Sequence, residues 1–175
     1  LNARLIAEPI RLFDCVMPCA GAEAYLVMSE EKAKSLDIPY ATILSTIERH
    51  NAFPDDPIQF RGGWALDIDD FYDQAGLDPS NIDFLQAYDD YPVICFMQIE
   101  DLGFCKKGEV AEFIKNKNLT TKGDFPINTS GGQLSTGQAG AGGGYLGVVE
   151  TIRQLTGQTL GHKIGTCSPC VMEFV

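Results

Sequence analysis

A chain of 175 residues, of which 45% are hydrophobic and 21% charged, has the composition of a soluble globular protein and suffices for one well-cored domain. Its net charge of −11 and the lack of any Lys/Arg cluster argue against nucleic-acid binding. No apolar run approaches the ~20 residues of a membrane span. We expect no signal peptide and a cytoplasmic location. Because the chain opens on Leu1 rather than methionine, we expect a processed, trimmed or cut start.

Hydrophobic periodicity and turn residues predict the following elements in chain order: strand 22–28, helix 29–36, strand 40–47, loop 50–63, helix 64–75, strand 82–87, helices 91–102 and 109–115, strand 125–128, helix 145–155, and strands 163–166 and 171–175. Ser29 is a typical N-cap residue, and Gly76 is a typical helix end. Strands that alternate with helices indicate the α/β class.

Half of the residues in the stretch 131–144 are glycine, and none is charged. The stretch leads into residues 145–155, whose apolar side chains recur at helical spacing. Glycine lets a backbone approach a ligand closely, and the start of a helix presents free N–H groups. We therefore predict a ligand cradle here, and a low-complexity linker is the alternative.

The segment Tyr88-Asp89-Asp90-Tyr91-Pro92 follows one predicted strand and precedes a helix. Ligand sites in α/β proteins form at such strand ends, and a tyrosine beside a carboxylate can supply an acid/base pair. The alternative is that Asp89 or Asp90 only caps the following helix.

Asn128 stands at the mouth of the glycine-rich stretch, where its amide can hold a water or an oxyanion. The alternative is an Asx turn that ends the preceding strand. His50 lies in a loop rich in Pro and Asp, so we expect a solvated side chain. His162 is expected at the surface.

Six cysteines at irregular spacing indicate reduced thiols of a cytosolic protein. Cys167 and Cys170 form a CxxC pair, and Cys15 and Cys19 form a CxxxC pair. A four-thiolate zinc site or a redox dithiol is the alternative. We expect no bound metal.

These motifs, in this order, resemble the C-terminal half of the thiolase superfamily, in particular its sterol-carrier-protein-like branch, often labelled lipid-transfer or acetyl-CoA acetyltransferase-like proteins. The segments that carry the resemblance are Ala20–Ala24, Glu48–Pro54, Arg61–Trp64, Tyr88–Pro92, Glu100–Cys105, Asn128–Gly132 and Gly137–Gly143.

The resemblance implies a thiolase-like fold of two βαβαβαββ halves. Residues 1–40 would end the N-terminal half, and residues 41–175 would form the C-terminal domain, with a five-stranded mixed sheet and helices on both faces. It also implies a homodimer, acyl-CoA substrates with no permanently bound cofactor, and carbon–carbon bond chemistry. Members of this branch are often partnered with a small OB-fold/zinc-ribbon protein.

The chain departs from the family where catalytic histidines are expected, since Tyr88-Asp89-Asp90-Tyr91 and Gly137-Gln138-Ala139 stand there. Tyrosines in place of histidine look more like the steroid side-chain aldolases of the superfamily, which cleave β-hydroxyacyl-CoA thioesters. The alternative is a catalytically silent acyl-CoA or lipid-binding homologue that acts with a partner subunit.

The resemblance assigns a role to each candidate residue. Tyr88 would transfer the proton, with Asp89 orienting it or acting beside it. Asn128 and Gln138 would polarise the thioester carbonyl or hold a water, together with the backbone at a set of glycines: Gly131, Gly132 and Gly137. Cys167 would be a second acid/base. The family's nucleophilic cysteine lies in the N-terminal half, so we expect residues 1–175 alone to be inactive.

Overall fold

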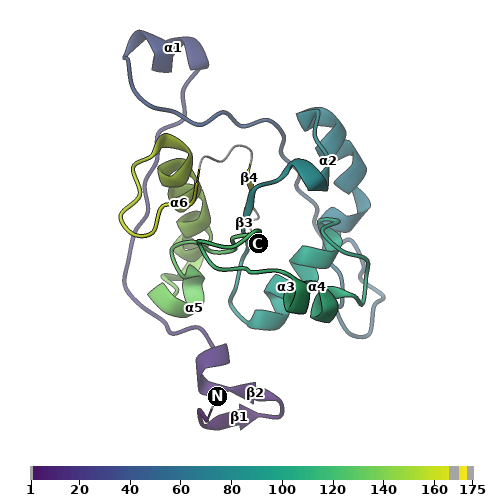
Figure 1. Ribbon diagram of the computed structural model, residues 1–175. Coiled ribbons are helices and arrows are strands. Elements are labelled where there is room, and N and C mark those ends of the chain that lie inside the picture. The colour runs from purple at the N-terminus through teal and green to yellow at the C-terminus, as the bar shows by residue number, and fades with distance from the viewer. Residues whose placement is uncertain (1, 166–169, 173–175) are drawn as a thin grey trace.

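The computed structural model describes residues 2–165 and the backbone of residues 170–172 (Figure 1). Its strands and α-helices are β1 (Leu5–Ala7), β2 (Ile10–Arg11), α1 (Glu30–Ser35), α2 (Ile68–Ala75), β3 (Phe84–Gln86), α3 (Pro92–Asp101), α4 (Val110–Asn116), α5 (Gly132–Thr136), α6 (Tyr145–Thr156) and β4 (Cys170–Met172). None of these helices is long and apolar enough to cross a membrane.

Strand β3 lies at the centre of the molecule and is fully buried. It pairs in parallel with β4, with Phe84 opposite Cys170 and Gln86 opposite Met172. On its other side, Leu85 forms a single parallel bridge with Ile127. The strand predicted at 82–87 is therefore confirmed, whereas the one predicted at 125–128 is reduced to one bridge.

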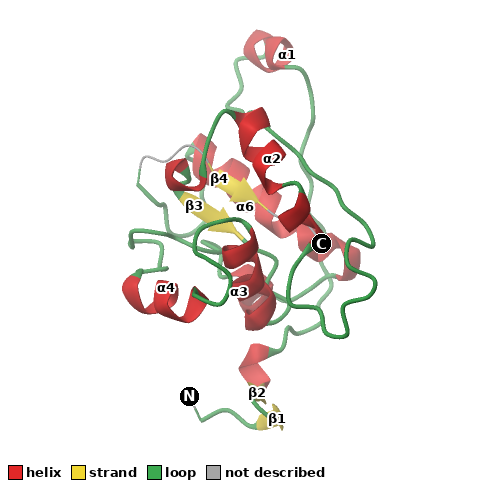
Figure 2. Cartoon of the chain, turned by 90° about the vertical axis from the view of Figure 1, so that its right-hand side faces the viewer, coloured by secondary structure: helices red, strands yellow, loops and turns green. Residues whose placement is uncertain are grey.

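Helices cover both faces of β3, as Figures 1 and 2 show. Leu85 belongs to a core cluster with Ile99 of α3 and Tyr72 of α2, while Gln86 on the opposite face meets Gly147 of α6. This alternation is the period of two that a strand imposes on its side chains. Gly147 allows α6 to approach closely, since a Cβ there would lie 3.3 Å from the Gln86 Cβ.

Four of the five predicted helices form with small changes of boundary, as α1, α3, α4 and α6. Ser29 accepts a hydrogen bond from the Lys32 N–H and caps α1. The predicted helix 64–75 consists of a 3₁₀ helix at Gly63–Leu66 followed by α2. It ends at Gly76, whose φ of +67° is left-handed as a C-terminal glycine requires. Helix α6 matches the amphipathic segment 145–155.

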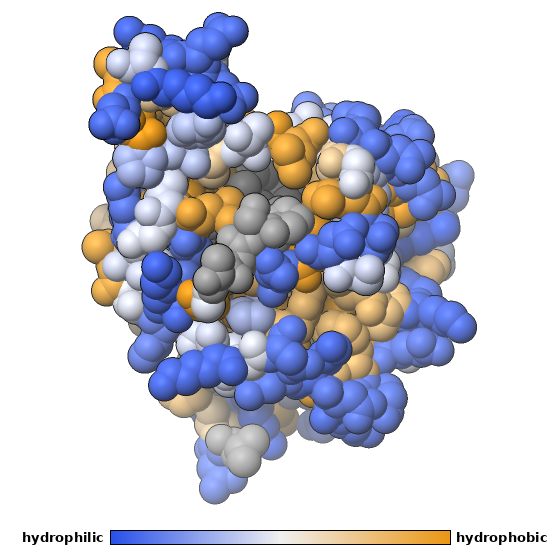
Figure 3. Space-filling model, turned by 45° about the horizontal axis from the view of Figure 1, so that its top comes forward, coloured by the Kyte–Doolittle hydropathy of each residue, from blue (hydrophilic) through white to orange (hydrophobic). Residues whose placement is uncertain are grey.

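The strands predicted at 22–28 and 40–47 are wrong for this structure, which has neither helix nor strand at any of these residues. Leu26 is 84% exposed and Ile43 is 69% exposed. A strand is stabilised by a neighbouring strand, and no such neighbour lies beside these segments within residues 2–165. Figure 3 shows that hydrophobic side chains remain at the surface among hydrophilic ones.

The described residues thus form a two-stranded parallel sheet and a separate two-stranded antiparallel sheet rather than the predicted five-stranded sheet. Residues 163–165 form no strand. Residue 166 and residues 173–175, which belong to the two closing strands of the prediction, lie outside the described part. The β1–β2 hairpin has no counterpart among the predicted elements.

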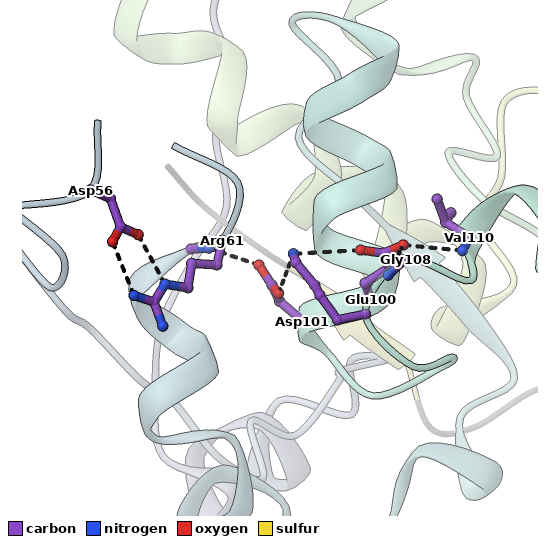
Figure 4. Close-up of polar contacts among 8 residues, drawn as sticks. Asp56, Arg61, Glu100, Asp101, Gly108 and Val110 are labelled. Atoms are coloured by element: carbon purple, nitrogen blue, oxygen red, sulfur yellow. Dashed lines mark hydrogen bonds and ion pairs between the residues drawn. The ribbon is translucent and has the colours of Figure 1, made fainter. Parts of the chain in front are cut away.

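Two carboxylates at the C-terminal end of α3 attach neighbouring loops to that helix (Figure 4). Asp101, which is 8% exposed, accepts hydrogen bonds from the Gly62 N–H at 2.7 Å and from Lys107 Nζ at 2.8 Å. Glu100 accepts from the N–H groups of Gly108 and Val110. A hydrogen bond to a carboxylate is stronger than one between neutral groups.

Candidate active site

A small pocket opens where β3 ends, and three segments of the chain contribute to it, residues 86–89, 128–133 and 143–147. Its lining residues are Gln86, Ala87, Tyr88, Asp89, Asn128, Ser130, Gly132, Gln133, Gly143, Gly144, Leu146 and Gly147. The structure therefore brings Tyr88, Asp89, Asn128 and Gly132 together, although about 40 residues separate the first two from the others in sequence. Their position at the C-terminal end of a parallel strand is the usual place for a ligand in an α/β protein.

Tyr88 is held by hydrogen bonds at its backbone and at its hydroxyl. Its backbone N–H donates to Gln98 Oε1 at 2.8 Å, and its carbonyl accepts from Gln98 Nε2 at 2.7 Å. Its hydroxyl oxygen accepts a hydrogen bond of 2.5 Å from Gln138 Nε2. Gln98 is completely buried, so the tyrosine is anchored in a rigid part of the core.

Burial raises the pKa of Tyr88, and the negative charge of Asp90 raises it further, while the hydrogen bond from Gln138 opposes both effects. The phenol is therefore protonated at neutral pH. In this form it can donate its proton while its oxygen accepts from Gln138.

Asp89 is 5% exposed and accepts a hydrogen bond of 2.7 Å from the Gln133 N–H in the first turn of α5. Burial raises the pKa of Asp89, and hydrogen bonds from the backbone of Gln133 and Leu134 and from the Asn128 side chain oppose this shift. Asp89 thus caps α5. The alternative that it caps the following helix is wrong, since α3 begins after Tyr91 without a side-chain cap.

The glycine-rich stretch is neither a linker nor one open loop, because it contains α5 and a 3₁₀ helix at Gly140–Gly144 before α6 begins. Gly132 has a φ of +65°, and a Cβ there would lie 2.0 Å from Asp89 Oδ2. Glycine is thus required for contact with a carboxylate of the protein itself. The short helix α5 was not predicted, and its Gln133 N–H is bound to Asp89.

Asn128 has a φ of +48°, and its side-chain oxygen accepts a hydrogen bond of 2.8 Å from the Ala87 N–H. Its own carbonyl accepts from the Gly131 N–H at 2.7 Å, which forms a tight turn. The amide therefore fastens this turn to the end of β3. An Asx turn would need that oxygen to accept from a residue just after Asn128, so this alternative is wrong here.

Gln138 lies beside a segment near the N-terminus that sequence reasoning did not connect with the site. Its N–H donates to the Met17 carbonyl at 2.9 Å, and its carbonyl accepts from the Cys19 N–H at 3.0 Å. A Cβ at Gly137, whose φ is +92°, would lie 2.9 Å from Cys19 Sγ. Residues 17–19 therefore fix the backbone from which Gln138 reaches Tyr88.

Sequence reasoning also missed Gln133, although it directly follows Gly131-Gly132. Its side chain lines the pocket and is 3% exposed. Its Oε1 is buried and has no hydrogen-bond partner in the described part of the chain. The sequence did contain a signal, because Gln133 is a polar residue inside the glycine-rich stretch 131–144 that was predicted to bind a ligand.

A buried polar chain behind the pocket was missed as well. Gln86 Nε2 donates to Thr129 Oγ1, which donates to Glu150 Oε1 at 2.6 Å. The same carboxylate oxygen accepts from Gln154 Nε2 at 2.8 Å. This chain fastens α6 to β3 and to the segment that contains Thr129. The walls of the pocket therefore have fixed positions.

Residues 69–173 match the family model described as thiolase C-terminal domain-like. The chain belongs to this family. It is 35% identical over 91% of its length to a steroid side-chain-cleaving aldolase of Thermomonospora curvata, and 32% identical over 94% to a 17-hydroxy-3-oxo-4-pregnene-20-carboxyl-CoA lyase of Mycobacterium tuberculosis. It spans 42% and 44% of the lengths of these two relatives.

The solved structure of an Ltp2-ChsH2(DUF35) aldolase superposes on this thiolase-like domain with a TM-score of 0.65 and 30% sequence identity. The match covers 90% of this chain and 42% of the other. The benzoylsuccinyl-CoA thiolase subunit BbsB of Thauera aromatica is 26% identical over the whole of this chain, which covers 46% of that subunit.

The remaining candidate residues of this thiolase-like domain lie away from the pocket or beyond the described part. Cys167 is outside the described residues, and only the backbone of Cys170 is described, so the zinc alternative is untested. No cluster of His, Cys, Asp and Glu within the described residues is arranged to hold a metal. His50 is exposed beside Glu48, and His162 is exposed, as predicted.

Proposed function

We propose that this chain is part of a thiolase-like enzyme that acts on a CoA thioester by breaking or forming a carbon–carbon bond, with retro-aldol cleavage of a β-hydroxyacyl-CoA as the reaction. The observation that carries the proposal is the Tyr88 hydroxyl, hydrogen-bonded to Gln138 and placed beside buried Asp89 in one pocket. The similarity to two relatives, an aldolase and a CoA lyase, supports it.

Retro-aldol cleavage needs proton transfer at two places. The β-hydroxyl loses a proton, the carbon–carbon bond breaks with its electron pair moving toward the thioester as an enolate, and the enolate then takes up a proton. A phenol with a raised pKa is a proton donor at neutral pH, which suits Tyr88 for the last step. Asp89, whose pKa burial raises, is a stronger base than an exposed carboxylate.

The thioester enolate carries negative charge that the site has to stabilise. The amides of Asn128 and Gln138 and the backbone at Gly131 and Gly132 are the groups we assign to the carbonyl or to a bound water. Gly137 allows the close approach of Cys19 that fixes Gln138. Cys167 is assigned a second acid/base role.

The same proposal includes the organisation of the protein. Residues 1–40 end an N-terminal thiolase half and residues 41–175 form the C-terminal domain, with a five-stranded mixed sheet once the halves are joined. The enzyme is a cytoplasmic homodimer that acts with an OB-fold/zinc-ribbon partner. The similar aldolase structure, whose name includes a DUF35 component, supports the partner. Residues 1–175 alone are expected to give no turnover.

The test is Tyr88→Phe in the natural protein, purified as the cell makes it, with its partner. Removing the phenol oxygen is expected to slow carbon–carbon cleavage about 10²- to 10⁴-fold while acyl-CoA binding persists. Tyr91→Phe is the matched control, since Tyr91 is in the same segment but 39% exposed. Unchanged turnover by Tyr88→Phe contradicts the assignment.

A catalytically silent acyl-CoA or lipid-binding homologue is the second candidate. It is favoured by the hydrogen bonds that Asp89 already accepts within the protein, which give this carboxylate a structural role. Acyl-CoA binding without turnover in the presence of the partner would support this candidate and exclude the first.

A further inference from the structure

The side-chain oxygen of Gln133 is an acceptor without a donor. It lies in the pocket wall, the residue is only 3% exposed, and no described residue donates to it. A buried acceptor without a donor carries the full cost of its desolvation. Such a group persists most readily where a ligand supplies the missing hydrogen.

The backbone around Gln133 is arranged to keep its amide in that position. The Gln133 N–H is bound to Asp89, which fixes the residue at the start of α5. A Cβ at Gly143 would lie 2.5 Å from Gln133 Oε1 and 2.9 Å from Gln138 Cγ, so only glycine leaves room for both side chains. The two glutamines thus meet at one glycine. The Gln138 amide donates to Tyr88, whereas Gln133 Oε1 accepts from no residue of the described part of the chain.

We infer that Gln133 is a substrate-binding residue whose Oε1 accepts a hydrogen bond from the β-hydroxyl of an acyl-CoA. This inference rests on the proposed function and adds a group that recognises the hydroxyl. Tyr88 and Asp89 line the same pocket. The hydroxyl proton points to Gln133 Oε1 in the bound state, and rotation about the C–O bond turns it to Asp89, which takes it as the carbon–carbon bond breaks. A site that binds a hydroxyl discriminates against the analogue that lacks it, because the buried acceptor is then left unpaired.

A matched pair of ligands tests this inference by isothermal titration of the natural protein with its partner. The probes are the two enantiomers of 3-hydroxyhexanoyl-CoA, each measured separately, hexanoyl-CoA, and CoA alone. The wild type is expected to bind one hydroxylated ligand about three- to tenfold more tightly than hexanoyl-CoA, as one neutral hydrogen bond allows. Gln133→Met, which keeps the length of the side chain, is expected to reduce that ratio to about one.

The control is Gln158→Met, which changes an exposed glutamine and is expected to keep the wild-type ratio. An equal ratio in the wild type and in Gln133→Met overturns the inference. Equal weakening of CoA alone also overturns it, because the amide then contacts the pantetheine chain instead of the acyl hydroxyl. If Gln133→Met does not fold, the wild-type ratio decides, and a ratio of one overturns the inference. Failure of every CoA ligand to bind overturns the proposed function itself.

Discussion

The carboxylate of Asp89 accepts a hydrogen bond of 2.7 Å from the backbone N–H of Gln133, which lies 44 residues further along the chain. This bond joins the end of β3 to the start of α5. It places the tyrosine that precedes Asp89 beside the glutamine that follows α5, and these two residues, Tyr88 and Gln138, are hydrogen-bonded. The same carboxylate therefore determines both the local fold and the geometry of the candidate active site.

Gly132→Ala tests the contact that surrounds this bond. The added methyl would lie 2.0 Å from Asp89 Oδ2, so the carboxylate must move and its hydrogen bond is lost. We expect a loss of about 2–4 kcal/mol in the free energy of unfolding, from backbone strain and a lost charged hydrogen bond. Gly140→Ala is the control, since its φ is also positive but no atom lies within 4 Å. It should cost only about 1 kcal/mol. Urea denaturation measures both losses, and an equal loss of unfolding free energy in the two variants would contradict the close contact between Gly132 and Asp89.

The charge of Asp89 should make stability depend on pH. Its pKa is raised in the folded state, so folding favours the protonated carboxyl. This contribution is fully present below the unfolded pKa of about 3.9 and is lost as the pH rises through the raised folded pKa. The wild type should thus lose stability relative to Asp89→Asn over that interval. Thermal unfolding of both proteins at a series of pH values measures the difference between their stabilities. A difference that does not change with pH would contradict the raised pKa of Asp89.

Gln98 is expected to be important for stability although it lies outside the pocket. Gln98→Met keeps the volume but leaves the N–H and the carbonyl of Tyr88 without their partners. Two partly buried unsatisfied groups correspond to about 2–4 kcal/mol of unfolding free energy. The exposed substitution Gln158→Met should change stability by less than about 0.5 kcal/mol. Chemical denaturation compares the two, and similar values would refute the role of Gln98.

The cysteines should differ in their reactivity toward alkylating reagents. Burial, helped by the charges of Glu100 and Glu109, raises the pKa of Cys105 to about 11, so little thiolate is present at pH 8. Cys19 is exposed, and Cys95 is buried. Site-resolved mass spectrometry after brief treatment with iodoacetamide should find Cys19 modified well before Cys105. Faster modification of Cys105 would show that its environment differs from the one described.

Local patterns predicted the helices well because their signals lie within the segments themselves. Ser29 caps α1, Gly76 ends α2, and the apolar spacing after Tyr145 corresponds to α6. Strands depend on neighbours that a local pattern does not contain. The segments at 22–28 and 40–47 therefore have strand-like sequences without forming strands within the described residues.

For the candidate site, strand order correctly indicated that Tyr88, Asp89 and Asn128 would lie together. The hydrogen-bond partners were not predictable, because Asp89 binds a residue of α5 and Asn128 binds the end of β3. Gln133 was missed because an unpartnered oxygen is recognised only when its surroundings are known. Contacts between distant segments, rather than residue types, were the missing information.

The loop at residues 50–61 lies between two firm attachments. Arg49 binds Asp67 through two nitrogen atoms, and the Gly62 N–H binds Asp101 at the end of α3. Doubling the length of a flexible loop costs only about 0.6 kcal/mol when its ends are held in place. Insertions or deletions here should therefore leave α3 undisturbed, and with it Gln98 and Tyr88. This loop is therefore a place where the chain should accept a fused peptide without a change at the pocket.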